Sequence, residues 1–148
     1  MRRKITKPRK SMPHLKVIPI GGLNEIGKNM TVLECNDQIL IIDCGLSFPE
    51  DEMYGIDIVI PDFSYLIENQ SKIVGMIITH GHEDHIGAIP YLLKKVKLPI
   101  YGTRLTLGLV ENKLKEHKII GDLRTIDAGD KVKMGCFNIE TIRTTHSI

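Results

Sequence analysis

The feature that most constrains this chain is a cluster of histidines and carboxylates directly after an apolar segment. Residues 72–79 form a near-continuous apolar run, which predicts a β-strand buried on both faces. The next residues, 80–85, read H-x-H-x-D-H. A helix is predicted from about 86 to 96 despite Pro90, a residue that is tolerated best in a first turn. The cluster is therefore predicted to lie between a buried strand and the N-terminus of a helix.

The residue types in this cluster are typical metal ligands. Neutral imidazole and carboxylate groups suit zinc, and manganese or iron less specifically, whereas calcium and magnesium prefer oxygen ligands alone. In a tight loop, His80 and His82 can face one metal while Asp84 and His85 diverge toward a second. Two metals about 3.5–4 Å apart can activate water and stabilise the leaving oxygen of a phosphodiester. The cluster predicts metal-assisted hydrolysis, with zinc as the first choice.

A structural zinc site and a histidine-rich surface loop are the alternative interpretations. A structural site normally closes with four ligands and no open position, whereas this pattern needs further ligands if it holds two metals. His146 follows a predicted strand and becomes a candidate ligand only in combination with the cluster. His14 and His117 have no comparable partners and are interpreted as structural or surface residues.

Asp43 ends a predicted strand, where a carboxylate is costly unless it is hydrogen-bonded or near a cation. It either orients a metal-bound histidine or caps the turn before Gly45, and the local sequence leaves both interpretations open.

The other segments predict strands first, followed by alternating helices and strands. This order is typical of an α/β fold in which sheets pack together with helices outside. A hairpin turn is expected at Asn36-Asp37. The predicted strands span 15–20, 30–35, 38–43, 56–60, 98–101, 123–126, 131–134 and 137–143, and the further helices span 62–69 and 103–117.

Charge is distributed unevenly along the chain. The net charge is +2, yet the first ten residues hold six bases and no acid, while the rest hold 14 bases and 18 acids. Residues 1–14 are therefore predicted to be a basic, disordered tail that can hold phosphate backbones without reading sequence. No apolar run reaches the roughly 20 residues that span a bilayer. Three cysteines without paired spacing argue against a disulfide framework and favour a reducing cytoplasm.

The cluster after its apolar strand resembles the signature of the metallo-β-lactamase superfamily, whose members share an αββα sandwich. Longer stretches at 19–30, 42–53, 55–62 and 80–93 resemble the ribonuclease J family. The likeness runs from about Leu15 to the last residue. It implies that residues 15–148 are the N-terminal part of a metallo-β-lactamase-like domain of the α/β class.

The resemblance also implies the roles of individual residues. Asp84 is expected to accept a proton from the attacking water, and Asp43 to support the site from behind its ligands. A separate calcium site is expected at the backbone oxygen of Gly55 and the carboxylate of Asp57, where oxygen donors lie in an acidic loop. The implied ligands are His80, His82 and His146 for the first metal, and Asp84 and His85 for the second.

The activity implied by the resemblance is that of a metal-dependent ribonuclease. Such an enzyme is cytoplasmic, combines 5′-to-3′ exonuclease and endonuclease activity, and acts in mRNA decay and rRNA maturation. The expected cofactors are two Zn2+ or Mn2+ ions per complete subunit, with Ca2+ in addition and no small-molecule organic cofactor. The expected partners are RNA and a second copy of the protein, with no membrane.

The resemblance further implies that the chain stops before the residues that complete the second metal site and before the RNA-gripping β-CASP insertion. We therefore expect the 148-residue chain to be incomplete and inactive alone. Two alternative functions are a small-molecule hydrolase of thioesterase or lactonase type, and a non-catalytic metal-binding or RNA-binding module.

Overall fold

A computed structural model of the chain describes residues 14–146. Of the predicted basic tail, residues 1–13 lie outside the described residues, and only the exposed His14 falls within them. None of the helices in this part of the chain combines the length and apolarity needed to cross a membrane.

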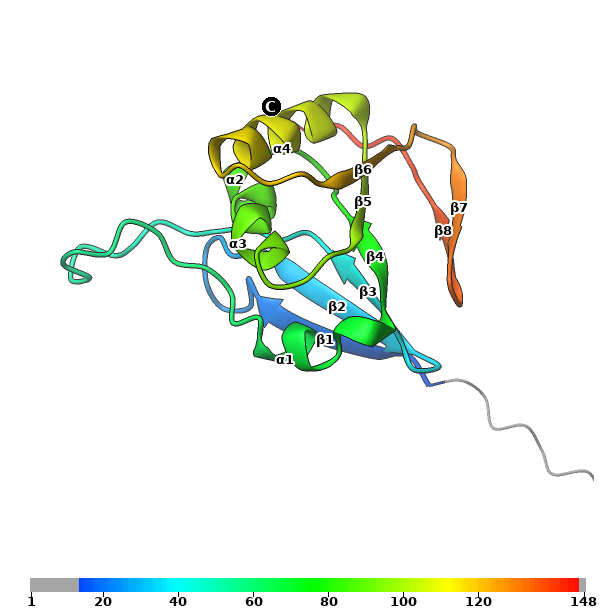
Figure 1. The fold of residues 1–148 in the computed structure, drawn as a ribbon, viewed down its shortest axis with the longest axis horizontal. Coiled ribbons are helices and arrows are strands. Elements are labelled where there is room, and N and C mark those ends of the chain that lie inside the picture. Colours follow the sequence, from blue (N-terminus) through cyan, green and yellow to red (C-terminus); the bar gives the residue numbers. More distant parts are fainter. Residues whose placement is uncertain (1–13, 147–148) are drawn as a thin grey trace, which may run out of the picture.

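A six-stranded mixed sheet forms the centre of the molecule (Figure 1). The first three strands form an antiparallel meander, and each later strand joins the previous one in parallel. The predicted hairpin turn is confirmed, because Asn36 and Asp37 both adopt positive φ angles, 50° and 58°. The strands lie side by side in chain order: β1 (Lys16–Gly21), β2 (Met30–Cys35), β3 (Gln38–Ile42), β4 (Ile73–Ile77), β5 (Pro99–Gly102) and β6 (Asp122–Thr125).

The helices cover one side of β4 and β5, and a separate antiparallel hairpin lies on the other side (Figure 1). This hairpin packs directly on the sheet, since a Cβ added to Gly75 in β4 would lie 2.3 Å from Met134 Cε. With both faces covered, the three consecutive residues Ile39, Leu40 and Ile41 of β3 are all buried. These elements are α1 (Ser64–Glu68), a 3-10 helix (Gln70–Lys72), α2 (Glu83–Ile86), α3 (Ile89–Leu93), α4 (Arg104–Glu116), β7 (Lys131–Met134) and β8 (Phe137–Glu140).

The predicted helix over 86–96 was wrong, because the chain forms two short helices there. Helix α2 already begins inside the histidine cluster at Glu83, and the helical hydrogen bonding breaks before α3. The break has a tertiary cause: the Ala88 amide donates to the Cys44 carbonyl, 3.0 Å away, instead of continuing α2. The segment after β3 therefore decides where α2 ends.

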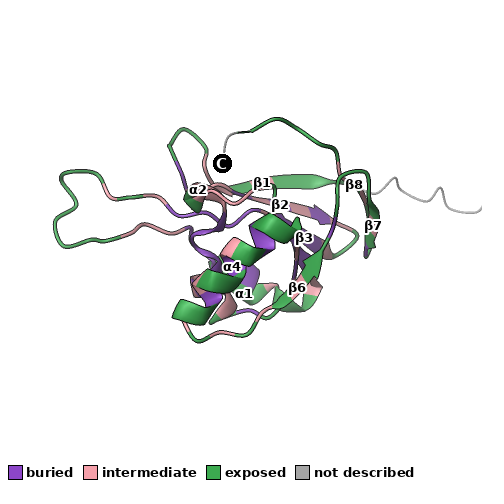
Figure 2. Ribbon diagram, turned by 90° about the horizontal axis from the view of Figure 1, so that it is seen from above, coloured by how far each residue is buried: buried purple, intermediate pink, exposed green. Residues whose placement is uncertain are grey.

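Two predicted strands also differ from the structure. Over 56–60 there is no strand, and Val59 forms an isolated bridge with Ser47. The last strand stops at Glu140 instead of Arg143, because Thr141 bonds to Gly129 and Asp130 in the turn before β7, where the strand β7 has not yet begun. The segment from Leu46 to Phe63 instead extends from the body as a long, largely exposed loop, which both ribbon views show (Figures 1 and 2).

Candidate metal centre

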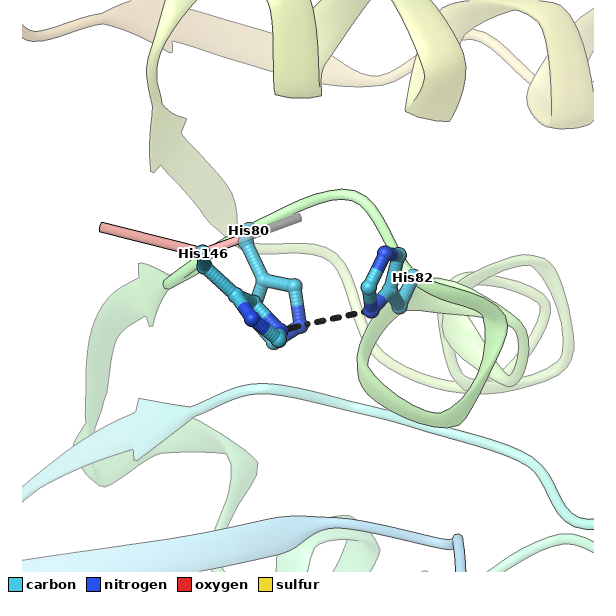
Figure 3. A group of neighbouring side chains, drawn as sticks. All are labelled: His80, His82 and His146. Atoms are coloured by element: carbon cyan, nitrogen blue, oxygen red, sulfur yellow. Dashed lines mark hydrogen bonds between the residues drawn. The ribbon is translucent and has the colours of Figure 1, made fainter. Parts of the chain in front are cut away.

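Three imidazole rings from three different positions in the fold converge at one point (Figure 3). His80 lies in the loop after β4, His82 directly precedes α2, and His146 lies in the segment after β8. His80 Nε2 is 3.2 Å from His82 Nδ1 and 3.0 Å from His146 Nε2. The candidate ligand atoms of all three residues lie within 4.8 Å of one another. The first predicted ligand set is thus brought together, across 66 residues of sequence.

A single buried carboxylate lies next to the cluster and bonds Thr79 and His85. Asp43, at the end of β3, is 5% exposed. Its Oδ1 accepts from the Thr79 amide and its Oδ2 from the Thr79 hydroxyl, both at 2.8 Å. His85 Nδ1 lies 2.8 Å from the same Oδ2 and donates to it. Asp43 thus contacts the candidate ligand His85 directly, and its role in supporting a metal site stays a prediction.

This hydrogen-bond network assigns the ring tautomers. Because the Thr79 hydroxyl gives its only proton to Asp43, it accepts from His80 Nδ1, 3.0 Å away. The His80 Nε2 lone pair then points toward His82 and His146, which is the form that a metal requires. In the same way, donation from His85 Nδ1 to Asp43 leaves the His85 Nε2 lone pair free of a proton.

The electrostatic environment of the two central imidazoles differs. Burial lowers the pKa of His80, and the neighbouring imidazoles of His85, His146 and His82 lower it further. Burial also lowers the pKa of His85, but its hydrogen bond to Asp43 and the charges of Asp43 and Asp84 outweigh burial and raise the pKa. His80 is therefore held in its neutral, metal-binding form more strongly than His85 is.

The second predicted ligand pair lies beside the first cluster. The His85 ring is 4.1 Å from the His80 ring, centroid to centroid, and Asp84 Oδ2 is 3.5 Å from His85 Nε2. Both of these atoms contact the Asn29 side chain: its amide nitrogen lies 2.9 Å from Asp84 Oδ2 and 3.1 Å from His85 Nε2. The side-chain amide of Asn29 thus occupies the position beside Asp84 Oδ2 and His85 Nε2 where a cation would bind.

Short helix α2 holds its place because the chain after β3 runs against it. The Cys44 amide donates to His85 O at 2.8 Å, and the Asn29 amide donates to Asp84 O at 3.0 Å. Gly45 permits this approach, since a Cβ there would lie 1.6 Å from Asp84 O. A cleft of about 590 Å3 opens beside Asp84, between the loop at 24–28 and the base of the long loop that carries Phe48.

The donor atoms fit one transition metal at the three-histidine position. Three imidazole nitrogens converging on one point match the ligand preference of zinc and leave a coordination position open. The Asp84 and His85 pair supplies two further donor atoms, but a second ion fits between them only if the Asn29 amide turns away.

The other candidate residues are not gathered into a site. Gly55 and Asp57, implied for calcium, are both exposed on the long loop. In the part of the chain that the structure describes, no group of three histidine, cysteine or acidic side chains forms around Asp57. His117 lies at the end of α4 beside Tyr91, at a ring separation of 5.2 Å.

Sequence reasoning assigned no role to two residues that the structure places at the centre. Asn29 reaches Asp84 across 55 residues, and no local pattern marks an asparagine before a strand as a contact of a distant helix. Thr79 was seen only as the end of the apolar segment. A hydroxyl next to the first histidine of the cluster was the available signal, because it can bond that ring and a carboxylate at once.

Comparison with known proteins agrees with this geometry. The sequence model of the metallo-β-lactamase superfamily matches residues 23–145. Proteins named ribonuclease J are similar over most of the chain: one from Synechocystis is 51% identical over 138 residues, and one from Thermus thermophilus is 46% identical over 144. These matches cover 90% and 91% of this chain but only 22% and 25% of the relatives. The resemblance to ribonuclease J is confirmed, and the chain spans about a quarter of the length of these relatives or less.

Solved structures place the fold in the same group. A metallo-β-lactamase fold protein, YhfI from Bacillus subtilis, superposes with a TM-score of 0.61 at 22% identity, covering 93% of this chain and 55% of that one. The Rm3 metallo-β-lactamase gives a TM-score of 0.53 at 16% identity, covering 82% and 46%. The predicted fold class, the N-terminal part of a metallo-β-lactamase-like α/β fold, is confirmed. Since the family match runs through the histidine cluster and on past β8, the chain belongs to the metallo-β-lactamase superfamily, whose domain implies divalent metal binding.

Proposed function

We propose that residues 15–148 are the N-terminal part of the catalytic domain of a metal-dependent ribonuclease of the ribonuclease J type. The observation that carries the hydrolase assignment is the convergence of His80, His82 and His146, whose ligand atoms lie within 4.8 Å of one another. RNA as the substrate is supported by the 51% and 48% identity to ribonucleases J from Synechocystis and Helicobacter pylori. Fold alone would not choose a substrate.

The proposed ligands are His80, His82 and His146 for one metal, and Asp84 and His85 for another. The imidazole-rich donor set favours zinc, with manganese as the alternative. When bound, the metals polarise the scissile phosphate and lower the pKa of water so that it attacks at neutral pH. Asp43 and Thr79 keep the histidine lone pairs directed at the metals.

Asp84 is the proposed proton acceptor in this reaction. Its side chain is 42% exposed and borders the 590 Å3 cleft, so a substrate and the attacking water can reach it. Among the described residues, Asn29 donates to Oδ2 of this carboxylate, and no hydrogen bond reaches Oδ1. An accessible carboxylate next to the histidine cluster can accept a proton from the attacking water.

The wider parts of the proposal follow from the similarity to ribonuclease J. They are cytoplasmic action in mRNA decay and rRNA maturation, self-association, a calcium site at Gly55 and Asp57, and a phosphate-binding tail at residues 1–14. The acidic loop, with Glu50, Asp51 and Glu52 near the proposed calcium ligands, supports the calcium site.

The test is hydrolysis of RNA by the complete gene product loaded with zinc or manganese. Wild type should degrade 5′-monophosphorylated single-stranded RNA to mononucleotides, and D84N should lose at least about 100-fold in rate if Asp84 is the base. Hydrolysis of thioester and lactone substrates is assayed in parallel. Turnover of those substrates with RNA left intact would replace the proposal with a small-molecule hydrolase.

A further inference from the structure

The positive charge of the folded body is concentrated on two neighbouring helices. Residues 91–118 carry seven Lys or Arg and two Glu, which is half of the 14 bases that follow residue 10. The long loop over 46–62 shows the opposite bias, with five acids and no base. The segments after α3 and at the end of α4 contact each other, and the end of α4 lies near α2 and α3 (Figure 1). The bases after α3 and at the end of α4 therefore lie near one another, and we call this region the α3–α4 surface. Arg104, at the start of α4, borders a different cleft.

Several of these cations lack a carboxylate partner. Lys94, Lys95 and Lys97 in the turn after α3, and Lys118 after α4, are exposed, and none forms an ion pair within residues 14–146. Lys115, by contrast, pairs with Glu111, and Lys113 with Glu83. Cations in the last turn of a helix can simply offset the helix dipole, but the three lysines after α3 follow a helix of only five residues. Their charge remains available to an anionic partner.

An aromatic ring lies among these lysines. Lys94 Nζ is 5.3 Å from the centroid of the Tyr91 ring and 3.5 Å from His117 Nδ1. Tyr91, Lys94 and Lys95 line a hollow of about 340 Å3 together with mostly apolar residues of the segment 60–67, among which Asp62 is the one acid. The surface thus combines unpaired cations with an apolar hollow that holds a half-exposed aromatic ring.

We propose that the α3–α4 surface binds single-stranded RNA outside the metal centre, with Lys94, Lys95 and Lys97 on consecutive phosphates and a base stacked in the hollow on Tyr91. Positive charge beside an aromatic platform is the combination that recognises single strands without sequence preference. An acidic protein would need the cations but not the hollow. The inference rests on the proposed ribonuclease function for the presence of RNA.

The surface is connected to the metal loop. Lys113, in the last turn of α4, pairs with Glu83, which lies between the proposed ligands His82 and Asp84. An RNA strand on the α3–α4 surface is therefore held next to a helix that one ion pair connects to the metal loop. Its role is to keep the strand close to the metal centre.

The test measures binding of a fluorescently labelled 20-nucleotide single-stranded RNA by anisotropy, with metals chelated so that the metal centre does not contribute. The triple variant K94Q/K95Q/K97Q should bind about tenfold more weakly at about 0.1 M salt, and the slope of log affinity against log salt should fall by about 2. The control K72Q/K131Q/K133Q removes equal charge on other elements and should stay within about twofold of wild type. All variants retain the basic tail, so the tail affects each equally.

Stacking is tested separately from charge. Y91L keeps an apolar side chain and should weaken single-stranded RNA binding by about tenfold, with double-stranded RNA binding unchanged. Photo-crosslinking of wild type with 4-thiouridine RNA should label the peptide that contains residues 91–97. This experiment tests whether RNA lies at Tyr91 even if Y91L unfolds.

Several outcomes would overturn the proposal. If both triple variants lose the same amount of RNA affinity, the effect depends on net charge alone and not on this surface. If the crosslinks fall outside residues 91–97, the RNA binds to another surface. If the lysine variant loses binding to anionic phospholipid vesicles while RNA binding stays unchanged, the surface is a membrane contact. RNA binding is measured without metal, so it does not depend on catalysis. If the complete enzyme does not cleave RNA, the proposed ribonuclease activity is refuted, but the RNA-binding result can still be interpreted.

Discussion

At the scale of single residues, the centre depends on one carboxylate that serves two imidazoles. Asp43 bonds His85 directly and reaches His80 through the Thr79 hydroxyl, so both rings carry their protons on Nδ1. Asp43 itself has a positive φ of 60°, a conformation that aspartate tolerates better than most residues. The Asp43 carboxylate bonds Thr79 and His85, whereas the Cys44 and Gly45 amides bond the His85 and Asn29 carbonyls, so the geometry supports the ligand-orienting interpretation and not turn capping.

Replacing Thr79 by valine tests this relay. Valine preserves the shape but leaves His80 Nδ1 without its acceptor and Asp43 Oδ2 with one donor fewer. We expect zinc affinity to fall by about 10–100-fold, as for other groups that orient a metal-bound histidine. T79S retains the hydroxyl and should bind zinc like wild type. Competition with a chromophoric chelator measures the zinc affinity of both variants. If T79V binds zinc as tightly as wild type, Thr79 does not orient His80 for metal binding.

Replacing His146 by alanine tests the contribution of the last described residue. His146 Nε2 is 3.0 Å from His80 Nε2, so its loss leaves two imidazoles at the first position. We expect zinc affinity to drop by at least about 100-fold, because two imidazoles alone seldom hold the ion. H14A removes an exposed histidine far along the chain and should bind zinc normally. Comparable zinc binding by H146A and H14A would show that His146 is no ligand.

At the scale of elements, α2 is a four-residue helix that cannot be stable alone, and its backbone contacts with the segment after β3 hold it in place. Gly45 is the point of closest approach, against Asp84 O. The glycine therefore determines how near the ligands on α2 lie to Asp43 on the sheet.

Two Gly-to-Ala substitutions separate close packing from chain flexibility. In G45A the new Cβ would overlap the backbone of Asp84, so we expect the free energy of unfolding to fall by about 3 kcal/mol or more. In G108A, inside α4, the Cβ meets nothing within 4 Å, and stability should rise by about 0.5–1 kcal/mol. Urea denaturation followed by circular dichroism measures both. A stable G45A protein would contradict the packing described for α2.

A second contact between elements predicts a dependence on pH. Glu34 in β2 accepts from the Tyr65 hydroxyl of α1 at 2.6 Å and from Lys16 of β1 at 3.2 Å. The Tyr65 hydrogen bond, followed by the one from Lys16, lowers the pKa of Glu34 below its ordinary value of 4.5, and Glu34 raises the pKa of Tyr65 to about 12. The carboxylate therefore contributes stability above pH 4.5, which is lost as the pH falls through its lowered pKa.

The variant Y65F should weaken this acid dependence. It removes the largest cause of the lowered pKa of Glu34, so the loss of stability between about pH 5 and pH 3 should be smaller than in wild type. Thermal melts across this pH range, with Y54F on the exposed loop as the control, measure the difference. Parallel curves for wild type and Y65F would contradict the assignment.

At the scale of the whole molecule, local patterns predicted the main elements but not their ends. The apolar run before the cluster gave β4, and Asn36-Asp37 gave the β2–β3 turn, because both signals are contained in a few residues. The break between α2 and α3 was missed because the Ala88 amide bonds to Cys44, 44 residues earlier. Asn29 was missed for the same reason, since its partners become neighbours only after folding. Four candidate ligands, His80, His82, Asp84 and His85, were recognisable from type and spacing, and Asp43 was recognisable as a candidate orienting group. His146 needed the family resemblance, and the contacts of Asn29 and Thr79 were not predicted.

The order of the strands also has a consequence for synthesis on the ribosome. Because β1 to β6 lie side by side in chain order, each strand finds its partner in residues that have already emerged. The nascent sheet can therefore grow by addition at one edge, with His80 and His82 placed early. His146 follows the strands by a further segment, so the three-histidine centre closes only after the sheet has formed. The proposed metal site is therefore complete only in a nascent chain whose sheet has already assembled.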